Sequence, residues 1–190
     1  MDELKELALN NLSKDNIDRT IHNIGHFVVA AYFNQIWRLD IKSDEHEFLP
    51  DMKKYATYTQ EDRAFSIATI YAAGSAAEDI YHDGYKEYAS INSMDEKSRK
   101  KVFEKMKYTH NRLFTDLRLA YPEIMRYLKL QNRPCNYITY EELPVEITER
   151  FISYAQKAIS EMALIDSKTP KEFLEDKITK IALHEALKSN

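Results

Sequence analysis

The spacing of apolar side chains predicts a chain built mainly from helices. Between residues 15 and 31 the apolar positions recur every three or four residues, at Ile17, Ile21, Ile24 and Val28. This spacing places them along one face of an α-helix. Such a face is buried against other elements, so we expect this helix to belong to the core.

Two short segments after this helix have the pattern of β-strands. Residues Ile36 to Ile41 alternate between apolar and polar side chains, and Tyr55 to Thr59 is a second, weaker candidate. The next helix is expected to begin at Thr59, because Asp62 stands at the position that completes a near capping box. We therefore expect a small β element between the first two core helices.

Prolines mark the boundaries of the later helices. One helix is expected to end at Pro122, and a further helical segment then ends near Asn132. Pro144 and Pro170 predict the starts of the two last helices, because proline fits the first helical turn. The final third of the chain is therefore also predicted to be helical.

The composition fits one globular unit. The chain has 190 residues, of which 44% are hydrophobic and 31% charged, enough for one domain with a real core. Only 3 glycines and 5 prolines interrupt it, which favours helices. We predict a mainly α fold with a domain over residues 1–132 and a C-terminal helical extension over residues 133–190, packed together as a single structural unit.

Charge and cysteine content restrict the function. The net charge is −4 with both signs interspersed, which argues against a nucleic-acid partner. The single cysteine, Cys135, excludes an intrachain disulfide and a Cys-based zinc finger. The acidic N-terminus does not resemble a signal peptide, and the longest apolar run, Phe27 to Phe33, is too short to span a bilayer. We therefore expect a cytoplasmic protein without a membrane segment of its own.

His22 and His26 have the spacing of two metal ligands. Residues four apart lie on the same face of a helix, so both imidazoles can reach one ion. Zinc binds neutral imidazole nitrogens and prefers four ligands in a tetrahedron, so two histidines form an incomplete site. Random placement of 6 histidines in 190 residues gives roughly 0.2 such pairs, so the pair alone is weak support.

Two later segments hold carboxylates. The segment A-A-G-S-A-A-E-D-I ends with Glu78 and Asp79, after small residues that let another helix approach closely. The segment T-D-L-R-L-A contains Asp116, a suitable third zinc ligand from a remote helix, which leaves one position for water. Taken singly, a tight helix crossing and a surface aspartate paired with Arg112 or Arg118 also explain these segments.

In this order, the three segments resemble the peptidase domain of the FtsH family, the membrane-anchored AAA+ zinc metalloproteases. That family has an H-E-x-G-H helix, a later G-x-A-A-E-E segment and then an N/S-D-L-x-x-A segment. The counterparts here are H-N-I-G-H from His22, G-S-A-A-E-D from Gly74 and T-D-L-R-L-A from Thr115. The resemblance covers about residues 15–130.

The resemblance implies that His22, His26 and Asp116 bind zinc and that Glu78 lies close behind the site, near a histidine N–H. Asn23 stands where the family has its general-base glutamate. A neutral amide can hold a water or a substrate carbonyl, but it cannot take up a proton near pH 7. The phosphate loop of the AAA+ module, G-x-x-x-x-G-K-[ST], has no counterpart in the chain.

The sequence leaves three functions open. The first is a catalytically impaired, zinc-binding pseudo-metallopeptidase that acts as a binding or regulatory protein, with polypeptide segments or other peptidase subunits as partners, as a monomer or an oligomer. The second is an active zinc metalloendopeptidase in which Glu78 or Asp79 substitutes as base. The third is a metal-free helical interaction module with His22 and His26 as hydrogen-bonded core residues. We prefer the first, because loss of a general base costs about 10² to 10⁴ in rate.

Overall fold

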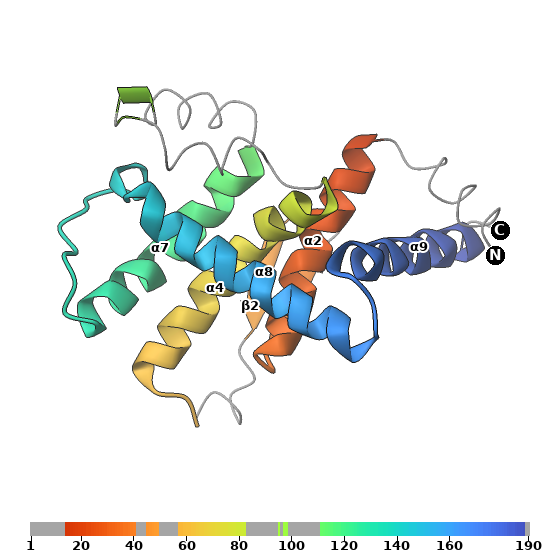
Figure 1. Ribbon diagram of the computed structural model, residues 1–190, viewed down its shortest axis with the longest axis horizontal. Coiled ribbons are helices and arrows are strands. Elements are labelled where there is room, and N and C mark those ends of the chain that lie inside the picture. Colours follow the sequence, from red (N-terminus) through yellow and green to blue (C-terminus); the bar gives the residue numbers. More distant parts are fainter. Residues whose placement is uncertain are drawn as a thin grey trace.

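The structure is a computed structural model that describes residues 14–40, 45–49, 57–82, 95, 97–98 and 111–188. Helices make up most of this part, so the predicted mainly α fold is confirmed (Figure 1). The α-helices are α2 (Lys14–Tyr32), α4 (Gln60–Tyr81), α7 (Asn111–Leu130), α8 (Val145–Ile165) and α9 (Pro170–Lys188).

The α4 helix lies at the centre of the bundle, and α2, α7 and α8 each pack against it. Most of its residues between Ala64 and Ala77 are buried, and many of them are alanine, glycine or serine. A helix that is buried on most sides belongs to the middle of a core. The small side chains let the neighbouring helices come close to the α4 backbone.

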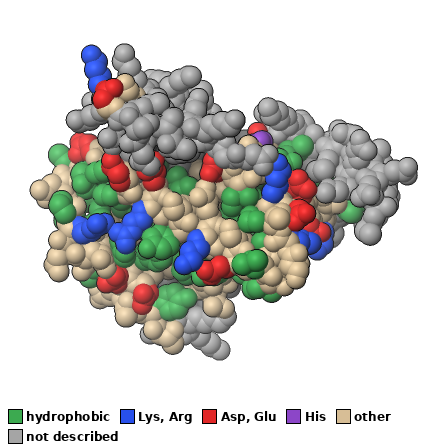
Figure 2. Space-filling model, viewed as in Figure 1, with side chains coloured by type: hydrophobic (Ala, Val, Ile, Leu, Met, Phe, Trp, Pro, Cys, Tyr) green, Lys and Arg blue, Asp and Glu red, His purple; other side chains and the backbone are tan. Residues whose placement is uncertain are grey.

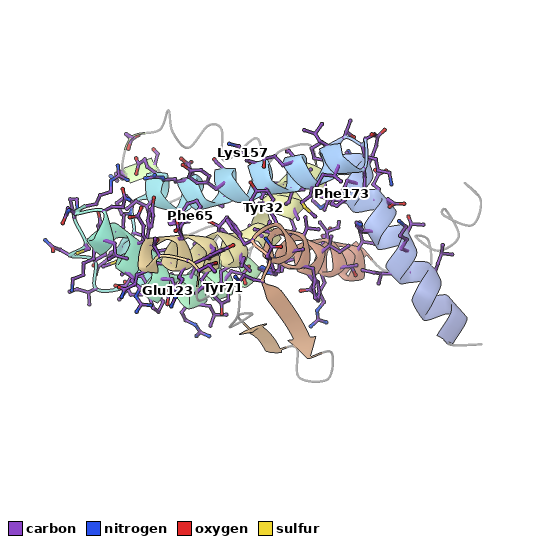
Figure 3. All side chains as sticks on the ribbon, turned by 90° about the horizontal axis from the view of Figure 1, so that it is seen from below. Tyr32, Phe65, Tyr71, Glu123, Lys157 and Phe173 are labelled. Carbon is purple, nitrogen blue, oxygen red and sulfur yellow. The ribbon has the colours of Figure 1, made fainter. Side chains whose placement is uncertain are left out.

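The bundle has two layers. The α2, α4 and α7 helices form one layer, and α8 crosses them as the second (Figure 3). A short 3-10 helix, η1 (Tyr140–Glu142), lies in the connection between α7 and α8. The core contains Phe151 of α8 and Phe173 of α9 together with Ile21 of α2, so its side chains come from both sides of the boundary proposed at residue 132.

Two strands follow α2 directly. β1 (Ile36–Asp40) and β2 (Glu45–Leu49) pair antiparallel, on the side of the bundle opposite α8 (Figure 3). The segment Tyr55 to Thr59 was predicted as a strand, but its described part is a turn that ends at Thr59. That prediction is wrong because Thr59 uses its backbone N–H and its hydroxyl to cap α4.

Two helix starts follow local rules that are readable in the sequence. The Thr59 hydroxyl accepts a hydrogen bond from the Asp62 N–H at 3.0 Å, and Asp62 accepts one from the Thr59 N–H at 3.3 Å, so the predicted capping box is confirmed. Thr169 and Glu172 make the same reciprocal contacts at the start of α9, with Pro170 at its first position. These contacts satisfy backbone donors that have no partner inside the helix.

The α7 helix continues through Pro122, where the sequence predicted a break. Proline has no N–H to bond the carbonyl of Arg118, and its ring crowds that carbonyl. Both halves of the helix nevertheless carry fully buried side chains, namely Leu117, Ala120, Ile124 and Leu128. The prediction is wrong because packing on both sides of Pro122 outweighs the local cost of the proline.

Among the described helices, none combines the length and the apolar character needed to cross a membrane.

Candidate metal centre

Two helices bring three ligand-type side chains to one point. α2 supplies His22 and His26 from successive turns, and α7 supplies Asp116. The Asp116 Oδ2 atom lies 3.0 Å from His22 Nε2 and 3.5 Å from His26 Nε2. One ligand atom from each residue lies within 4.8 Å of the other two. The three side chains are therefore close enough to bind one metal ion.

The cluster is buried. His26 is fully inaccessible, and His22 and Asp116 are each 2% exposed. Buried polar atoms normally have hydrogen-bond partners, because an unpaired one costs free energy. Although Asp116 Oδ2 faces both imidazoles, it makes no hydrogen bond of good geometry with a described residue. A carboxylate oxygen and two imidazole nitrogens that converge in this way form a donor set suited to a metal ion.

Contacts on the outer edges of both rings fix their orientation. His26 Nδ1 lies 2.7 Å from the carbonyl oxygen of Ile70, to which it can donate a hydrogen bond. His22 Nδ1 lies 3.2 Å from Glu78 Oε1. Each ring thereby turns its other nitrogen, Nε2, toward Asp116. Outer contacts of this kind are typical of metal-binding histidines, because they set both the tautomer and the ring orientation.

Glycines allow the close crossing of α2 and α4 that positions His22. A Cβ atom on Gly74 would lie 2.6 Å from His22 Nδ1, so the imidazole rests directly on the α4 backbone. A Cβ atom on Gly25 would collide with the carbonyl of Ala73 and lie 2.8 Å from the Ala77 side chain. The sequence indicated a tight crossing here but not that Gly74 makes room for the ring. A glycine inside a helix was the available signal, because it costs about 1 kcal/mol relative to alanine.

Mutual charge stabilises the cluster when no metal is bound. Burial alone would lower the pKa of His22, but the charge of Asp116, helped by Glu78, outweighs burial and raises that pKa to about 9. Burial alone would raise the pKa of Asp116, but the charges of His26 and His22 outweigh it and lower that pKa to about 2. The metal-free cluster therefore holds a proton on the His22 side that an ion would have to displace.

Asn23 places a neutral amide beside the histidine pair. It follows His22 directly, so it lies about 100° further round α2. Its side chain is only 9% exposed, and its Oδ1 atom makes no hydrogen bond with a described residue. Asn23, which the resemblance places at a general-base position, is therefore a buried side chain that can donate or accept a hydrogen bond but cannot take up a proton.

The two acidic residues considered as substitute bases are engaged elsewhere. Glu78 contacts His22 on the ring edge remote from Nε2. Asp79 accepts a hydrogen bond from the side-chain amide of Gln156 on α8. The Glu78 contact lies on the ring edge opposite the converging ligand atoms, which argues against Glu78 as a substitute base.

Tyr71 is a neighbour of the cluster that the sequence did not single out. It follows Ile70 on α4, and its pKa is raised by burial and then by the negative charges of Asp116 and Glu123. Figure 3 shows Tyr71 of α4 and Glu123 of α7 close together on these adjacent helices. The phenol therefore stays protonated near the acidic side of the cluster. No spacing rule connects Tyr71 with Asp116, because they come from different helices.

Comparison with protein-family models, with curated proteins and with solved structures found no match to the chain. The likeness to FtsH-type peptidases therefore rests on the three motifs themselves. In the structure, two of those motifs meet at one point, where they place His22, His26 and Asp116 close together. Glu78, from the remaining motif, contacts one of these histidines.

Proposed function

We propose that this chain is a stand-alone, zinc-binding relative of the FtsH-type peptidases, catalytically impaired, that acts as a binding or regulatory protein. The observation that carries the proposal is the convergence of His22 Nε2, His26 Nε2 and Asp116 Oδ2. Two imidazoles and one carboxylate are the ligands of many zinc sites, and they leave one coordination position open.

The surroundings of the ligands support zinc over a hard cation. Calcium and magnesium prefer oxygen ligands, whereas imidazole nitrogens suit zinc and other first-row transition metals. The contacts of His26 with Ile70 and of His22 with Glu78 hold both rings with Nε2 inward. Zinc at this position would act as a Lewis acid that polarises a carbonyl oxygen.

The impaired character follows from Asn23. Peptide hydrolysis needs a group that removes a proton from the attacking water, and an amide cannot do so. The Asn23 side chain can instead donate a hydrogen bond to a peptide carbonyl. Because the ligands and Asn23 are buried, the centre would hold a polypeptide segment, without cutting it, only when the surrounding structure opens. Binding without cleavage is the behaviour of an adaptor or of a regulatory subunit paired with active peptidases.

The metal content of the purified protein tests the proposal. The chain is produced without a metal-affinity tag, and zinc per chain is measured by elemental mass spectrometry for wild type and for Asp116→Asn. We expect about one zinc per chain in the wild type and loss of most of it in the variant, because one of three protein ligands is removed. An Asp176→Asn control removes a surface carboxylate that pairs with Lys168 and Lys180, and it should keep its zinc.

Two outcomes would contradict the proposal. One is a wild-type protein that stays metal-free after zinc is supplied; the cluster would then be a buried ion pair in an interaction module. The other is an Asp116→Asn protein that keeps a full zinc complement. Circular dichroism of both variants shows whether the helices are intact, so that loss of zinc is not confused with loss of fold.

A further inference from the structure

A second site-like feature lies away from the metal centre. A cavity of about 380 Å³ opens where the end of α7 leads into the start of α8. Tyr127 and Leu128 of α7 form part of its wall. Tyr127 comes eleven residues after Asp116 on the same helix, which places it about 16 Å further along the axis. The cavity and the metal centre are therefore separate sites.

Two arginines give this cavity a positive charge. Arg133, from the connection after α7, and Arg150, from α8, both line it. The Arg150 guanidinium donates a hydrogen bond to the Tyr127 hydroxyl at 3.3 Å. Its central carbon also lies 5.7 Å from the ring centre of Tyr127 and 5.8 Å from that of Tyr154. Arg150 is therefore held in place before any ligand arrives.

Neither guanidinium is neutralised within the described part of the chain. No described carboxylate lies within ion-pair distance of Arg133 or of Arg150, although Glu146 lines the same cavity. Two positive side chains and one negative one give the lining a net charge of +1. An arginine stays charged at physiological pH and presents parallel N–H groups that match the two oxygens of a carboxylate.

The rest of the wall is apolar or aromatic. Leu128, Pro134, Ile147 and Phe151 contribute to it, and the volume lies in the lower part of the range for small-molecule sites. Figure 2 shows basic and hydrophobic side chains next to each other at the end of the molecule where α7 leads into α8. A single charged group with an apolar body fits such a wall better than a polyanion does, because Glu146 repels additional negative charge.

We propose that this cavity binds a monocarboxylate with an apolar or aromatic body, gripped by Arg133 and Arg150. The carboxylate pairs with the two guanidiniums, and the body lies against Leu128, Ile147 and Phe151. Two sources carry this chemistry: the C-terminal residue of a polypeptide and a free aromatic or fatty acid. Binding at this cavity does not depend on zinc, so its test is independent of the test of the proposed function.

A pair of matched ligands tests the recognition of the carboxylate. The full-length chain is titrated with N-acetylphenylalanine and with N-acetylphenylalanine amide, and amide shifts are followed by two-dimensional ¹H–¹⁵N NMR. We expect the acid to shift signals from residues around the cavity and to bind at least about tenfold more tightly than the amide, because charge-assisted hydrogen bonds are lost in the amide.

Charge variants test which side chains grip the ligand. Arg133→Gln should weaken binding of the acid by about tenfold or more, and because Arg133 is exposed its replacement should leave the fold intact. Lys129→Gln removes the same charge from an exposed residue next to Leu128 but outside the cavity wall, so binding should stay within about twofold. Arg150→Gln is the second variant and should weaken binding at least as much as Arg133→Gln.

Further ligands distinguish the two sources. A hexapeptide that ends in phenylalanine is compared, with a free and with an amidated C-terminus, against 3-phenylpropionate. Tighter binding of the free-acid peptide than of 3-phenylpropionate assigns the site to polypeptide ends, and the reverse order assigns it to free acids. Equal binding of the N-acetylphenylalanine acid and its amide, equal binding by wild type and Arg133→Gln, or no binding of any carboxylate would overturn the proposal.

Discussion

The metal centre and the arginine-lined cavity use charge in opposite ways. In the metal centre the charged groups are almost inaccessible, and they compensate one another: Asp116 lies between His22 and His26. In the cavity, Arg133 is exposed, and neither it nor Arg150 has a carboxylate partner among the described residues. A closed cluster is suited to holding an ion or a proton, whereas an open, uncompensated cluster is suited to recognising a group from outside.

The supporting contacts differ as well. The His22 ring rests on the α4 backbone at Gly74, so there is no room for a side chain at that position. Arg150 instead lies over the faces of Tyr127 and Tyr154 and next to an empty volume. The packing around His22 therefore does not tolerate a larger side chain at Gly74, whereas the space beside Arg150 can accept a ligand. We therefore expect substitutions near the metal ligands to change activity or stability, and substitutions in the cavity wall to change ligand binding alone.

The largest expected effect is a gain of activity in Asn23→Glu. If Asn23 is what the metal centre lacks, restoring a carboxylate there should raise zinc-dependent peptide hydrolysis by about 10² to 10⁴, the usual contribution of a general base. The measurement is cleavage of a fluorogenic peptide with and without a chelator. Asn23→Gln, which adds length without a base, is the matched control and should stay inactive.

Two results of this assay would change the interpretation of the centre. Chelator-sensitive hydrolysis by the wild type would show that the chain is an active endopeptidase. A zinc-loaded Asn23→Glu protein without activity would show that the site lacks more than its base. Arg133→Gln added to Asn23→Glu should leave the rate on short peptides with amidated ends unchanged, because the cavity is about 16 Å away along α7.

A loss of stability in Gly74→Ala is the next largest effect. The new Cβ would meet the His22 ring and force α2 and α4 apart, which typically costs about 1 to 3 kcal/mol. Urea unfolding followed by circular dichroism measures this loss, and the zinc content should fall with it. Ser75→Ala is the neighbouring control: the buried Ser75 hydroxyl makes no hydrogen bond with a described residue, so its removal should not lower the stability. A Gly74→Ala protein as stable as wild type would contradict the close packing of the ring.

The sequence predicted that the three side chains of the candidate metal centre would lie together, because each of them leaves a local signal. A four-residue histidine spacing, a stretch of small residues and a remote aspartate are each visible in the chain, and the structure brings His22, His26 and Asp116 together. The helical character and the Thr59 cap were likewise predictable, since periodicity and capping are local properties. The strand predicted at Tyr55 to Thr59 was wrong because Thr59 caps α4, and the break predicted at Pro122 was wrong because packing on both sides of the proline keeps α7 continuous.

The arginine-lined cavity had no such signal. Arg133 and Arg150 occur in ordinary polar positions of a connection and a helix, and nothing in their spacing indicates that they line one cavity. Their shared place in the cavity wall depends on how the connection after Asn132 leads into α8. The contact of His26 with the Ile70 carbonyl was equally hidden, because it involves backbone atoms of a helix remote in sequence. Contacts between residues this far apart in the sequence become visible only in the three-dimensional structure.

The smallest expected effect is a difference in pH dependence between the two sites. In the zinc-free protein, the raised pKa of His22 stabilises the fold fully below about pH 6.5, and this contribution is lost as the pH rises through about 9. Zinc requires the deprotonated ring, so its affinity should rise by about tenfold, or 1.4 kcal/mol, per pH unit between pH 7 and pH 8.5. Competition with a chromophoric chelator measures this slope.

The cavity provides the matched control for that slope. The guanidiniums of Arg133 and Arg150 keep their charge over this pH range, so binding of N-acetylphenylalanine should stay constant. A flat zinc affinity would show that His22 holds no proton in the metal-free protein, and a sloping carboxylate affinity would show that a titrating group other than the arginines controls the cavity.

The burial of the ligands also has a kinetic consequence. Because His26 is inaccessible and His22 and Asp116 are almost so, an ion can enter or leave only when the structure around these side chains opens locally. The exchange rate is then limited by how often the structure opens and not by the lifetime of a coordination bond. Once loaded, such a centre would keep its ion through brief changes in the metal supply. Its metal content would then depend on the metal that was present when the chain folded.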